Sequence, residues 1–487
     1  MGKRAKAVFI AALLLMVIPA AGCFNSGVGK DGGSYIDDDY LAALDGSETE
    51  VTVLSSSAHS IGAGYADQII PSYAAKLTQE RAEKGYNEIS QYFVTKEAYN
   101  YNADNNHIRL RYVDWGWDEP LVQKMTAAIM AWNSGIRSAP DVVIGETQLK
   151  SYALQGHLQR FPDELEQWIR ENMLSSSYKF MELSAAESPD GKAGIFGVAY
   201  DAAPQILIWD KSVLRDCGIS EAVTENGVET WQEWLNVCKA VGSKKGYIAG
   251  GIYAGDNTGG AIRTYPFIQM AGGTLQNSDG SPNLNNAGAT AALEFVREQS
   301  KTNLTENYLG AQSEQEYYSY FGKKMGYATA GSYQLGVWSD AGRDLANLGR
   351  CRLPVYASGD KGTTTLIAST YLAVPSWTDK AGDAFKVIKS YCSEQVQTVL
   401  GRRAFKPVNN VKVGEADWYK TNLQYFAYQI MKNDNIAYLP AFLSNGTSIW
   451  TEFNRALVKA ALHKSYPNTV KSYLDQAQTE ASKYFGG

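Results

Sequence analysis

The segment from Gly194 to Ile219, GIFGVAYDAAPQILIWDKSVLRDCGI, constrains the fold of this chain more than any other. Two runs rich in β-forming residues, Ile195–Tyr200 and Gln205–Trp209, flank a break at residues 201–204. Pro204 has no N–H to donate to a neighbouring strand, which excludes it from the interior of a central strand. We therefore interpret residues 201–204 as a crossing between two bodies.

An α/β pattern precedes this crossing, and a mostly helical pattern with short strands follows it. The βαβαβ succession before the crossing predicts a mainly parallel sheet, and the polar stretch 84–107 is predicted as an inserted hairpin or loop. Strands are expected at 51–54, 108–113, 141–144, 325–329, 350–355 and 371–374. Helices are expected at about 62–83, 118–132, 163–174, 230–241, 261–271, 287–300, 313–321, 379–400, 415–432, 447–462 and 468–485.

The N-terminus has the pattern of a targeting signal. A basic start precedes an apolar run from Ala7 to Ile18, and small residues lead to Cys23. Residues 1–22 resemble a bacterial lipoprotein signal peptide, in which the cysteine becomes the lipidated first residue. The alternative is an ordinary secretory signal with an incidental cysteine. Residues 23–49 are rich in Gly, Ser and Asp, which is typical of a flexible tether.

Charge and motifs exclude several classes of protein. Removal of residues 1–22 leaves 42 basic and 51 acidic residues, a net charge of −9, which argues against nucleic acid as a partner. No P-loop, HExxH, GxSxG or nucleotide-binding GxGxxG is found in a supporting context. The four histidines have no ligand spacing, and the four later cysteines form no CxxC pair. We expect no metal, no cofactor, free thiols and no catalytic residue.

Aromatic side chains provide the strongest indication of a ligand. The chain has 31 Tyr and 11 Trp, and several are expected at loop positions facing a cleft. Tyr333 and Trp338 are expected to flank a loop, Trp115 and Trp117 follow a strand, and Trp450 begins a helix. Sugars offer C–H faces to such rings and hydroxyls to polar side chains. The alternative is that each ring only fills the core.

Several stretches resemble the extracellular solute-binding proteins of bacterial carbohydrate ABC transporters, the maltodextrin and multiple-sugar group. The similarity runs from about Val51 to the C-terminus, with the motifs in the family's order. They are APDVVIG (139–145) with GHLQRF (156–161), GVAYDAAPQILIWDK (197–211), TWQEW (230–234), YPFIQMAGGTL (265–275), ATAGSYQLG (328–336) and ASTYLAVPSWTDKAGDAFKVIKSYCSEQVQ (368–397).

This resemblance implies a periplasmic-binding-protein-like fold of type II, with two α/β lobes joined by a hinge around a ligand cleft. The first lobe would comprise 50–200 plus 370–405 and the second 203–365 plus 410–487, with crossings near Asp201, Thr365 and Pro407. By the same resemblance, Tyr333 and Trp450 match aromatic sugar contacts. The ligand-binding residues expected from the resemblance and the loop positions are Ser57, His59, Trp115, Glu146, Thr147, Asp201, Tyr265, Tyr333, Trp338 and Trp450.

The function implied is that of a lipid-anchored binding protein that captures a sugar or oligosaccharide and delivers it to an ABC transporter permease. We expect a monomer that meets the membrane only through the lipid on Cys23. Two alternatives stay open. A secreted carbohydrate-active enzyme would need a carboxylate pair at catalytic spacing, and a binder of a peptide or polyamine would favour a charged cleft over aromatic rings.

Overall fold

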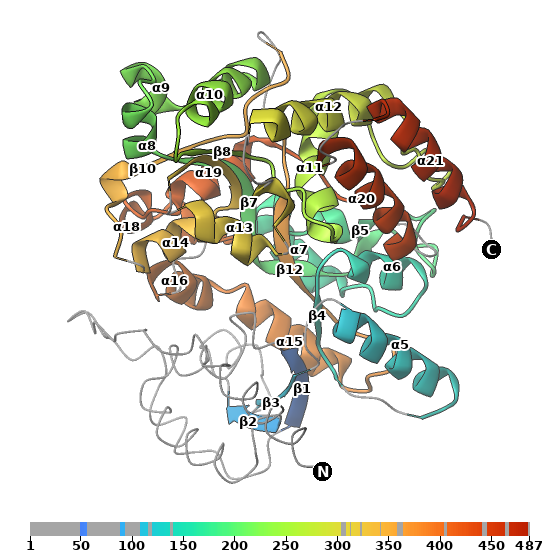
Figure 1. The fold of residues 1–487 in the computed structure, drawn as a ribbon. Helices are drawn as coiled ribbons and strands as arrows, with labels where there is room; N and C mark the ends of the chain where they lie inside the picture. Colours follow the sequence, from blue (N-terminus) through green and yellow to red (C-terminus); the bar gives the residue numbers. More distant parts are fainter. Residues whose placement is uncertain are drawn as a thin grey trace, which may run out of the picture.

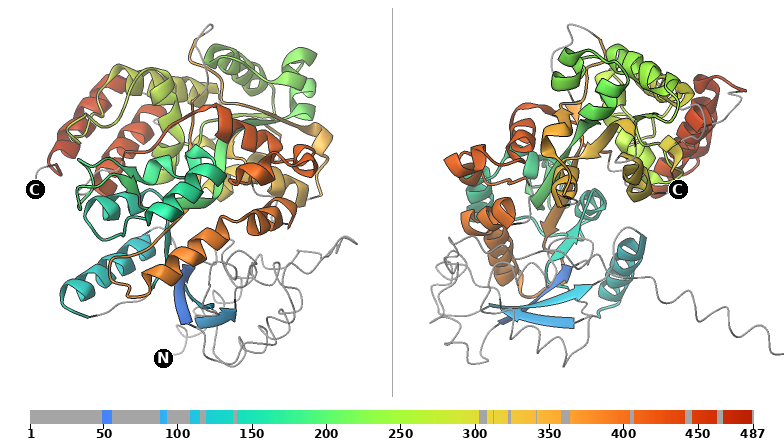
Figure 2. Two further views of the ribbon diagram at one scale, coloured as in Figure 1. Left: turned by 180° about the vertical axis from the view of Figure 1, so that it is seen from behind. Right: turned by 60° about the vertical axis from the view of Figure 1, so that its left-hand side comes forward.

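The computed structural model describes most of the chain beyond residue 48. Its helices and strands form two bodies with long strands between them (Figures 1 and 2). The described residues are 49–55, 88–92, 108–114, 119–136, 140–302, 308–311, 313–321, 324–340, 342–357, 364–403, 407–440, 446–462 and 467–485. The signal segment, Cys23, Ser57, His59, the helix expected at 62–83, Trp115 and Trp117 lie outside these ranges.

Strand β7 (Val198–Asp210) connects the two bodies. Its first half pairs antiparallel with β12 (Ile367–Ala373), and its second half pairs antiparallel with β9 (Met325–Gly331) and β10 (Leu348–Cys351). β7 and β12 lie in the middle of the molecule in Figure 1. The crossing predicted at residues 201–204 is therefore confirmed.

The predicted break in the strand is wrong, because β7 runs without interruption through Pro204. Pro204 is the residue at which the hydrogen-bonding partner of β7 changes from β12 to β9. Its carbonyl accepts a hydrogen bond from the N–H of Ser332 at 2.9 Å, and the next residue, Gln205, donates its N–H to the carbonyl of Leu366 at 2.7 Å. Backbone hydrogen bonds between strands therefore continue on both sides of the missing N–H. This explains why the strand tolerates a proline, which is excluded from the middle of a regularly paired central strand.

The strands predicted at 51–54, 108–113 and 141–144 are parallel to one another, as expected, because the first pairs parallel with the second and Val53 bridges parallel to Val142. Two further strands make the arrangement mixed. β1 (Thr49–Ser55) runs parallel to β3 (Ile108–Asp114), but β2 (Glu88–Tyr92) is antiparallel to β3. β4 (Val143–Gly145) is antiparallel to β12, because β12 returns from the opposite body. The 84–107 stretch thus contributes β2 as a strand of this sheet.

Helices and short elements surround this sheet. α5 and α7 correspond to predicted helices, but the single helix expected at 379–400 is interrupted. There Ser393 accepts a hydrogen bond from the N–H of Val396 at 3.3 Å and so starts a second helix. The elements are α5 (Glu119–Asn133), α6 (Gln148–Leu154), α7 (Asp163–Asn172), η2 (Ser175–Ser177), η3 (Lys179–Met181), β5 (Glu182–Leu183), β6 (Gly194–Ile195), α15 (Ala381–Tyr391) and α16 (Glu394–Arg403). Two buried clusters drawn from residues 51–200 and 371–400 form the core here.

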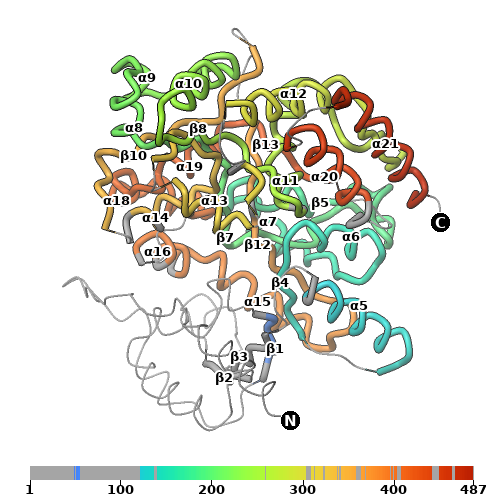
Figure 3. Tube along the Cα trace, in the orientation of Figure 1, coloured from blue at the N-terminus to red at the C-terminus, as the bar shows by residue number. Residues whose placement is uncertain are grey.

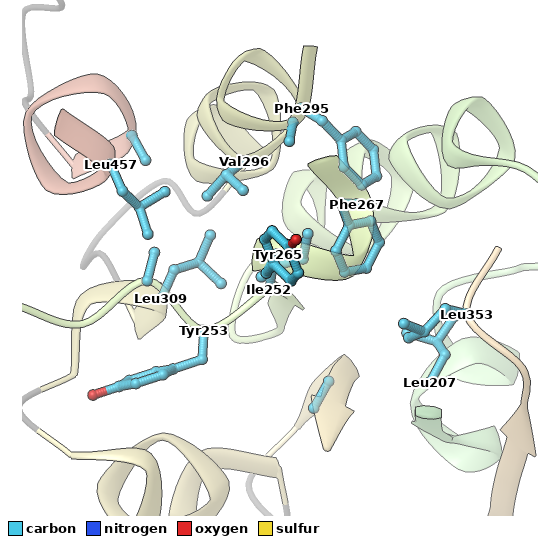
Figure 4. Packing of buried hydrophobic residues seen from close by; sticks show 14 of the residues in the cluster. Leu207, Ile252, Tyr253, Tyr265, Phe267, Phe295, Val296, Leu309, Leu353 and Leu457 are labelled. Carbon is cyan, nitrogen blue, oxygen red and sulfur yellow. The ribbon is translucent and has the colours of Figure 1, made fainter. Parts of the chain in front are cut away.

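The second body is mostly helical, with β8 (Ile248–Gly251) parallel to β9. Thr230 and Glu233 form the predicted capping box at the start of α10. The helices are α8 (Lys211–Asp216), α9 (Glu221–Asn226), α10 (Trp231–Ser243), α11 (Thr258–Met270), α12 (Ala287–Thr302), η4 (Tyr308–Gly310), α13 (Glu314–Phe321), α14 (Tyr333–Asp340), η5 (Leu345–Asn347), α20 (Gly446–Leu462) and α21 (Val470–Ser482). The C-terminal pair α20 and α21 lies beside α12 (Figure 3). One large buried cluster, spanning residues 206–481, forms this core (Figure 4).

Three short helices replace the single helix expected at 415–432. They are α17 (Val411–Gly414), α18 (Asp417–Lys420) and α19 (Tyr425–Asn433). The carbonyl oxygen of the Asn422 side chain accepts from the N–H of Gln424 at 2.8 Å, a local turn that separates α18 from α19. Residues of this segment form a fourth buried cluster with Leu174 and Ala202. The chain then passes through β13 (Asn435–Ile436), which pairs parallel with β11 (Thr364–Thr365).

The described cysteines are all free thiols. Cys238 and Cys392 are buried, and Cys217 and Cys351 are partly exposed. Burial raises the pKa of the Cys238 thiol to about 12, so this group stays protonated at neutral pH. In the ranges given above, no helix combines the length and the apolar character needed to cross a membrane.

Candidate functional site

A cavity of about 350 Å³ lies where the two bodies meet. The first body contributes Glu146 and Thr147 to its lining, and the second contributes residues of α11 and α13. The joining strand β12 and the segment after β13 complete the wall with Ser369 and residues 437–439. Its walls thus come from segments far apart in the sequence, at the place where the chain crosses between the bodies.

Three aromatic rings that contact one another line the cavity. Phe180, Tyr371 and Tyr438 all line it. The centroid of the Phe180 ring lies 5.5 Å from that of Tyr371 and 6.1 Å from that of Tyr438, to which it is nearly parallel at 23°. Burial raises the pKa of Tyr438 to about 12, so its hydroxyl stays protonated and can donate a hydrogen bond. None of the three rings was predicted from the sequence to contact a ligand.

A charged pair also lines the cavity. Nε of Arg263 donates to Oε1 of Glu314 at 2.6 Å, and Nη2 donates to Oε2 at 3.1 Å, the bidentate geometry typical of arginine and carboxylate. Arg263 is 6% exposed. Burial opposes its charge, but the Glu314 carboxylate outweighs this and raises the pKa of Arg263 well above its ordinary value. Both residues line the cavity.

Two neighbours hold this pair in place. The hydroxyl of Tyr333 lies 3.4 Å from both Nη2 of Arg263 and Oε2 of Glu314. The side-chain amide of Gln205, on the joining strand β7, donates to the main-chain carbonyl of Arg263 at 3.0 Å. The crossing strand is thereby hydrogen-bonded to α11, the helix that carries Arg263.

Of the described residues predicted for the site, Glu146 and Thr147 line the cavity. Both follow β4, at the carboxyl end of a strand where open α/β sheets present ligand contacts. Tyr333 does not line the cavity, but its hydroxyl lies 3.4 Å from Nη2 of Arg263, which does. Asp201 is buried on β7, where it pairs with Thr370 of β12.

The other predicted aromatics pack within the second body. Tyr265 is 2% exposed and lies among core side chains such as Ile252 and Phe267 (Figure 4). Trp450 is partly buried and meets Tyr265 edge-on, with 6.0 Å between ring centroids. Trp338 is 7% exposed and packs on Phe321.

The loop expected between Tyr333 and Trp338 is wrong, because both residues belong to helix α14. On a helix, two residues five positions apart point to different sides of the helix axis. Tyr333 is directed to Arg263 and Glu314, whereas the indole N–H of Trp338 donates to the carbonyl of Asp344 at 3.2 Å. The two rings therefore have different surroundings.

The chemistry of the cavity is that of a binding site for a polar molecule with apolar faces. It combines aromatic rings, a guanidinium, two carboxylates and several hydroxyls. Among the residues that the structure describes, no group of three or more His, Cys, Asp or Glu side chains could hold a metal ion.

The comparisons with solved structures show the same fold. The cyclic alpha-maltosyl-1,6-maltose binding protein from Arthrobacter globiformis has a TM-score of 0.63 at 17% identity, covering 90% of this chain and 99% of its own. Maltose-bound MalE3 of T. maritima has a TM-score of 0.63 at 14% identity, covering 89% and 99%. An ABC transporter solute-binding protein from Agrobacterium radiobacter K84, in complex with ribitol, has a TM-score of 0.63 at 15% identity, covering 91% and 100%.

No curated protein matched the sequence. The family is identified instead by a sequence model, described as "Bacterial extracellular solute-binding protein", which matches residues 83–398. This match spans more than half of the chain and includes β7, β12 and all the lining residues up to Tyr371. The fold expected from the resemblance is confirmed: it is periplasmic-binding-protein-like, with two α/β lobes around a cleft. The chain belongs to the bacterial extracellular solute-binding proteins.

Proposed function

We propose that the protein captures a small carbohydrate in the cavity between its two bodies and delivers it to the permease of an ABC transporter. The observation that carries this proposal is the composition of the cavity wall. Thr147 comes from the first body, Ile262 from the second, and Ser369 from the strand that joins them. A ligand held there touches both bodies at once, which is what a protein that encloses its ligand requires.

The lining suits a sugar. The rings of Phe180 and Tyr438 are available to cover C–H faces, while Glu146, Arg263 and Ser369 can exchange hydrogen bonds with hydroxyls. The volume of about 350 Å³ lies near the lower end of the range for small-molecule pockets, which is about 300–1,000 Å³. This size favours a short saccharide over a long one.

The printed names of the structural neighbours support the same class. They describe a maltosyl-maltose binder, a maltose complex and a ribitol complex, all of them sugars or polyols. Two of the neighbours are named as solute-binding proteins of ABC transporters. Delivery to a permease is the corresponding proposal for this chain.

We place the lobes at residues 50–200 plus 370–405 and 203–365 plus 410–487, with one refinement. The separate buried clusters on either side of the crossing support this division. Helices α17 and α18 share a cluster with Leu174 and Ala202, so we assign them to the first lobe. Helix α19 packs on both lobes, because Tyr428 belongs to this cluster and Ile430 to the large core of the second lobe. The chain then returns to the second lobe through β13, where Ala437 and Leu439 join the large core.

The proposal also includes a lipid anchor on Cys23, which the order of basic, apolar and small residues before this cysteine supports. The family is extracellular, so the body lies outside the cytoplasm. Replacing Cys23 with Ser should release the protein from the membrane into the soluble fraction. A variant that stays with the membrane would show that lipid on Cys23 is not the anchor.

A ligand screen tests the binding function. The mature protein is heated with a panel of mono- and oligosaccharides, and a sugar that binds only the folded state raises the melting temperature. Each sugar that gives a shift is then recovered and examined by chromatography. Intact recovery is expected of a binding protein, whereas cleavage products would identify an enzyme. A shift with a peptide or polyamine, and none with any sugar, would contradict the carbohydrate assignment.

A further inference from the structure

The guanidinium in the cavity has its charge balanced by a neighbouring carboxylate. Both oxygens of Glu314 receive hydrogen bonds from Arg263, at 2.6 and 3.1 Å. The side chain of Arg263 is 7% exposed and that of Glu314 is 25% exposed, so water screens the pair little. A ligand entering the cavity therefore meets an ion pair instead of an isolated positive charge.

One nitrogen of this guanidinium is still without a partner. Nη1 of Arg263 is buried and makes no hydrogen bond, while Nε and Nη2 are both used. A buried hydrogen-bond donor without an acceptor costs free energy. An oxygen atom of a bound molecule that accepts this hydrogen bond would remove that cost. Arg263 lines the cavity, so a ligand can supply that oxygen once the guanidinium turns to expose Nη1.

We propose that the Arg263–Glu314 pair determines the class of ligand, so that the cleft accepts uncharged sugars and rejects their acidic counterparts. This inference rests on the carbohydrate-binding function proposed above. Nη1 offers one hydrogen bond to a neutral oxygen, such as a hydroxyl or a ring oxygen. A carboxylate on the ligand gains the same hydrogen bond but finds no uncompensated positive charge.

The same pair acts against an acidic sugar. A carboxylate bound at Nη1 lies close to the carboxylate of Glu314, and like charges at short range in a poorly screened site repel each other. Glu146, which follows β4 in the first body, is a second acidic residue of the lining. Specificity of this kind comes from a repulsive element as well as an attractive one.

The test compares matched pairs of sugars. The probes are the methyl glycosides of glucose, galactose and mannose, with maltose and cellobiose. Each is titrated beside the analogue in which the C6 hydroxymethyl group of the non-reducing sugar is oxidised to a carboxylate. With the unmodified protein, at least one neutral sugar binds and its acidic analogue binds at least tenfold more weakly.

The deciding variant is Glu314→Gln, with Glu316→Gln as its control. Glu314→Gln leaves the charge of Arg263 uncompensated, so an acidic ligand now supplies the missing counter-charge. The ratio of the two affinities should move at least tenfold toward the acidic sugar. Glu316 is exposed on the same helix and does not line the cavity, so Glu316→Gln makes the same charge change and should leave the ratio unaltered.

The possible results distinguish the proposed binding function from the proposed role of the ion pair. Failure of every neutral sugar to bind the unmodified protein would overturn the proposed function itself. Neutral binding with equal or tighter binding of the acidic analogue, or an unchanged ratio in Glu314→Gln, would overturn only the role of the pair. If Glu314→Gln does not fold, the double variant Arg263→Gln/Glu314→Gln removes both charges together. Retention of the original ratio by the double variant would also overturn this role.

Discussion

Pro204 of β7 pairs with Ile367 of β12, and it is the last residue of β7 to pair with that strand. The next residue, Gln205, pairs with Gly331 of β9. The two bodies are therefore joined through a continuous strand that exchanges partners at a proline. Rotation of one body against the other requires changes in backbone dihedral angles around this exchange.

We expect the two bodies to close on a bound ligand. A sugar that touches both bodies has a higher affinity for the closed form and shifts the population toward it. Small-angle scattering should show a smaller radius of gyration with a saturating sugar than without one. A sugar from the same panel that gives no thermal shift serves as the control. Equal radii with and without a bound ligand would contradict closure.

Tyr438 is expected to provide a stacking surface in the cavity. Truncation of a central aromatic at a binding surface can cost about 2 kcal/mol or more. Tyr438→Ala should therefore weaken sugar binding at least about tenfold, since one decade corresponds to about 1.4 kcal/mol. Tyr438→Phe keeps the ring and should change affinity much less. Calorimetric titration measures both, and equal affinity in all three proteins would remove Tyr438 from the site.

Tyr333 and Trp450 are also predicted to contact the sugar, by resemblance to the family. Tyr333→Ala and Trp450→Ala should each weaken binding at least about tenfold. Trp338, which packs on Phe321, provides the comparison: Trp338→Ala should lower the melting temperature while the folded protein keeps its affinity. If the alanine variants of Tyr333 and Trp450 behave as Trp338→Ala does, their role is to pack the second body.

Gly250 should tolerate no larger residue, in contrast to Gly246. Both have positive φ, +75° and +86°, where alanine costs about 1–2 kcal/mol. A Cβ at Gly250 would lie 1.8 Å from the carbonyl oxygen of Tyr327, whereas nothing lies within 4 Å of one at Gly246. Gly250→Ala should therefore lose a further 1–3 kcal/mol or so to overpacking. Urea unfolding measures the difference, and equal losses in both variants would contradict the contact.

The buried tyrosines predict a loss of stability at alkaline pH. Burial raises the pKa of Tyr317, Tyr327 and Tyr371 above 10, the value that the unfolded chain has. The folded state thus holds these protons after the unfolded chain has released them. No effect is expected below about pH 10, and above it each group lowers the free energy of unfolding by up to about 1.4 kcal/mol per pH unit.

Urea unfolding at a series of pH values from 8 to 11 checks this expectation, with absorbance at 295 nm to follow ionisation of the phenols. The midpoint should fall above pH 10, and part of the absorbance change should accompany unfolding. A constant midpoint with complete ionisation in the folded protein would contradict it.

The sequence allowed prediction of features that depend on neighbouring residues. The capping box of Thr230 and Glu233 lies within one helical turn, and Glu146 and Thr147 directly follow the strand that positions them. The crossing at Pro204 was found because proline has a local restriction. Such signals located most of the helices and the place where the two bodies join.

The remaining features depend on contacts between distant segments. Arg263 and Glu314 are 51 residues apart, and neither belongs to a pattern that marks a binding residue. Phe180 meets Tyr371 and Tyr438 only because η3, β12 and the segment after β13 converge. An arginine on a helix or a phenylalanine near a short turn is usually a surface or core residue, so composition alone could not select these.

The position of β12 between β4 and β7 determines when the first body can fold. Leu372 of β12 lies in the same buried cluster as Val51 of β1, so a growing chain cannot complete that core until more than two thirds of it has been synthesised. Domains generally fold as units during synthesis, with the N-terminal one first. Here the late synthesis of one strand delays completion of the first body until β12 is available, so the second body's early segments and the first body must fold together.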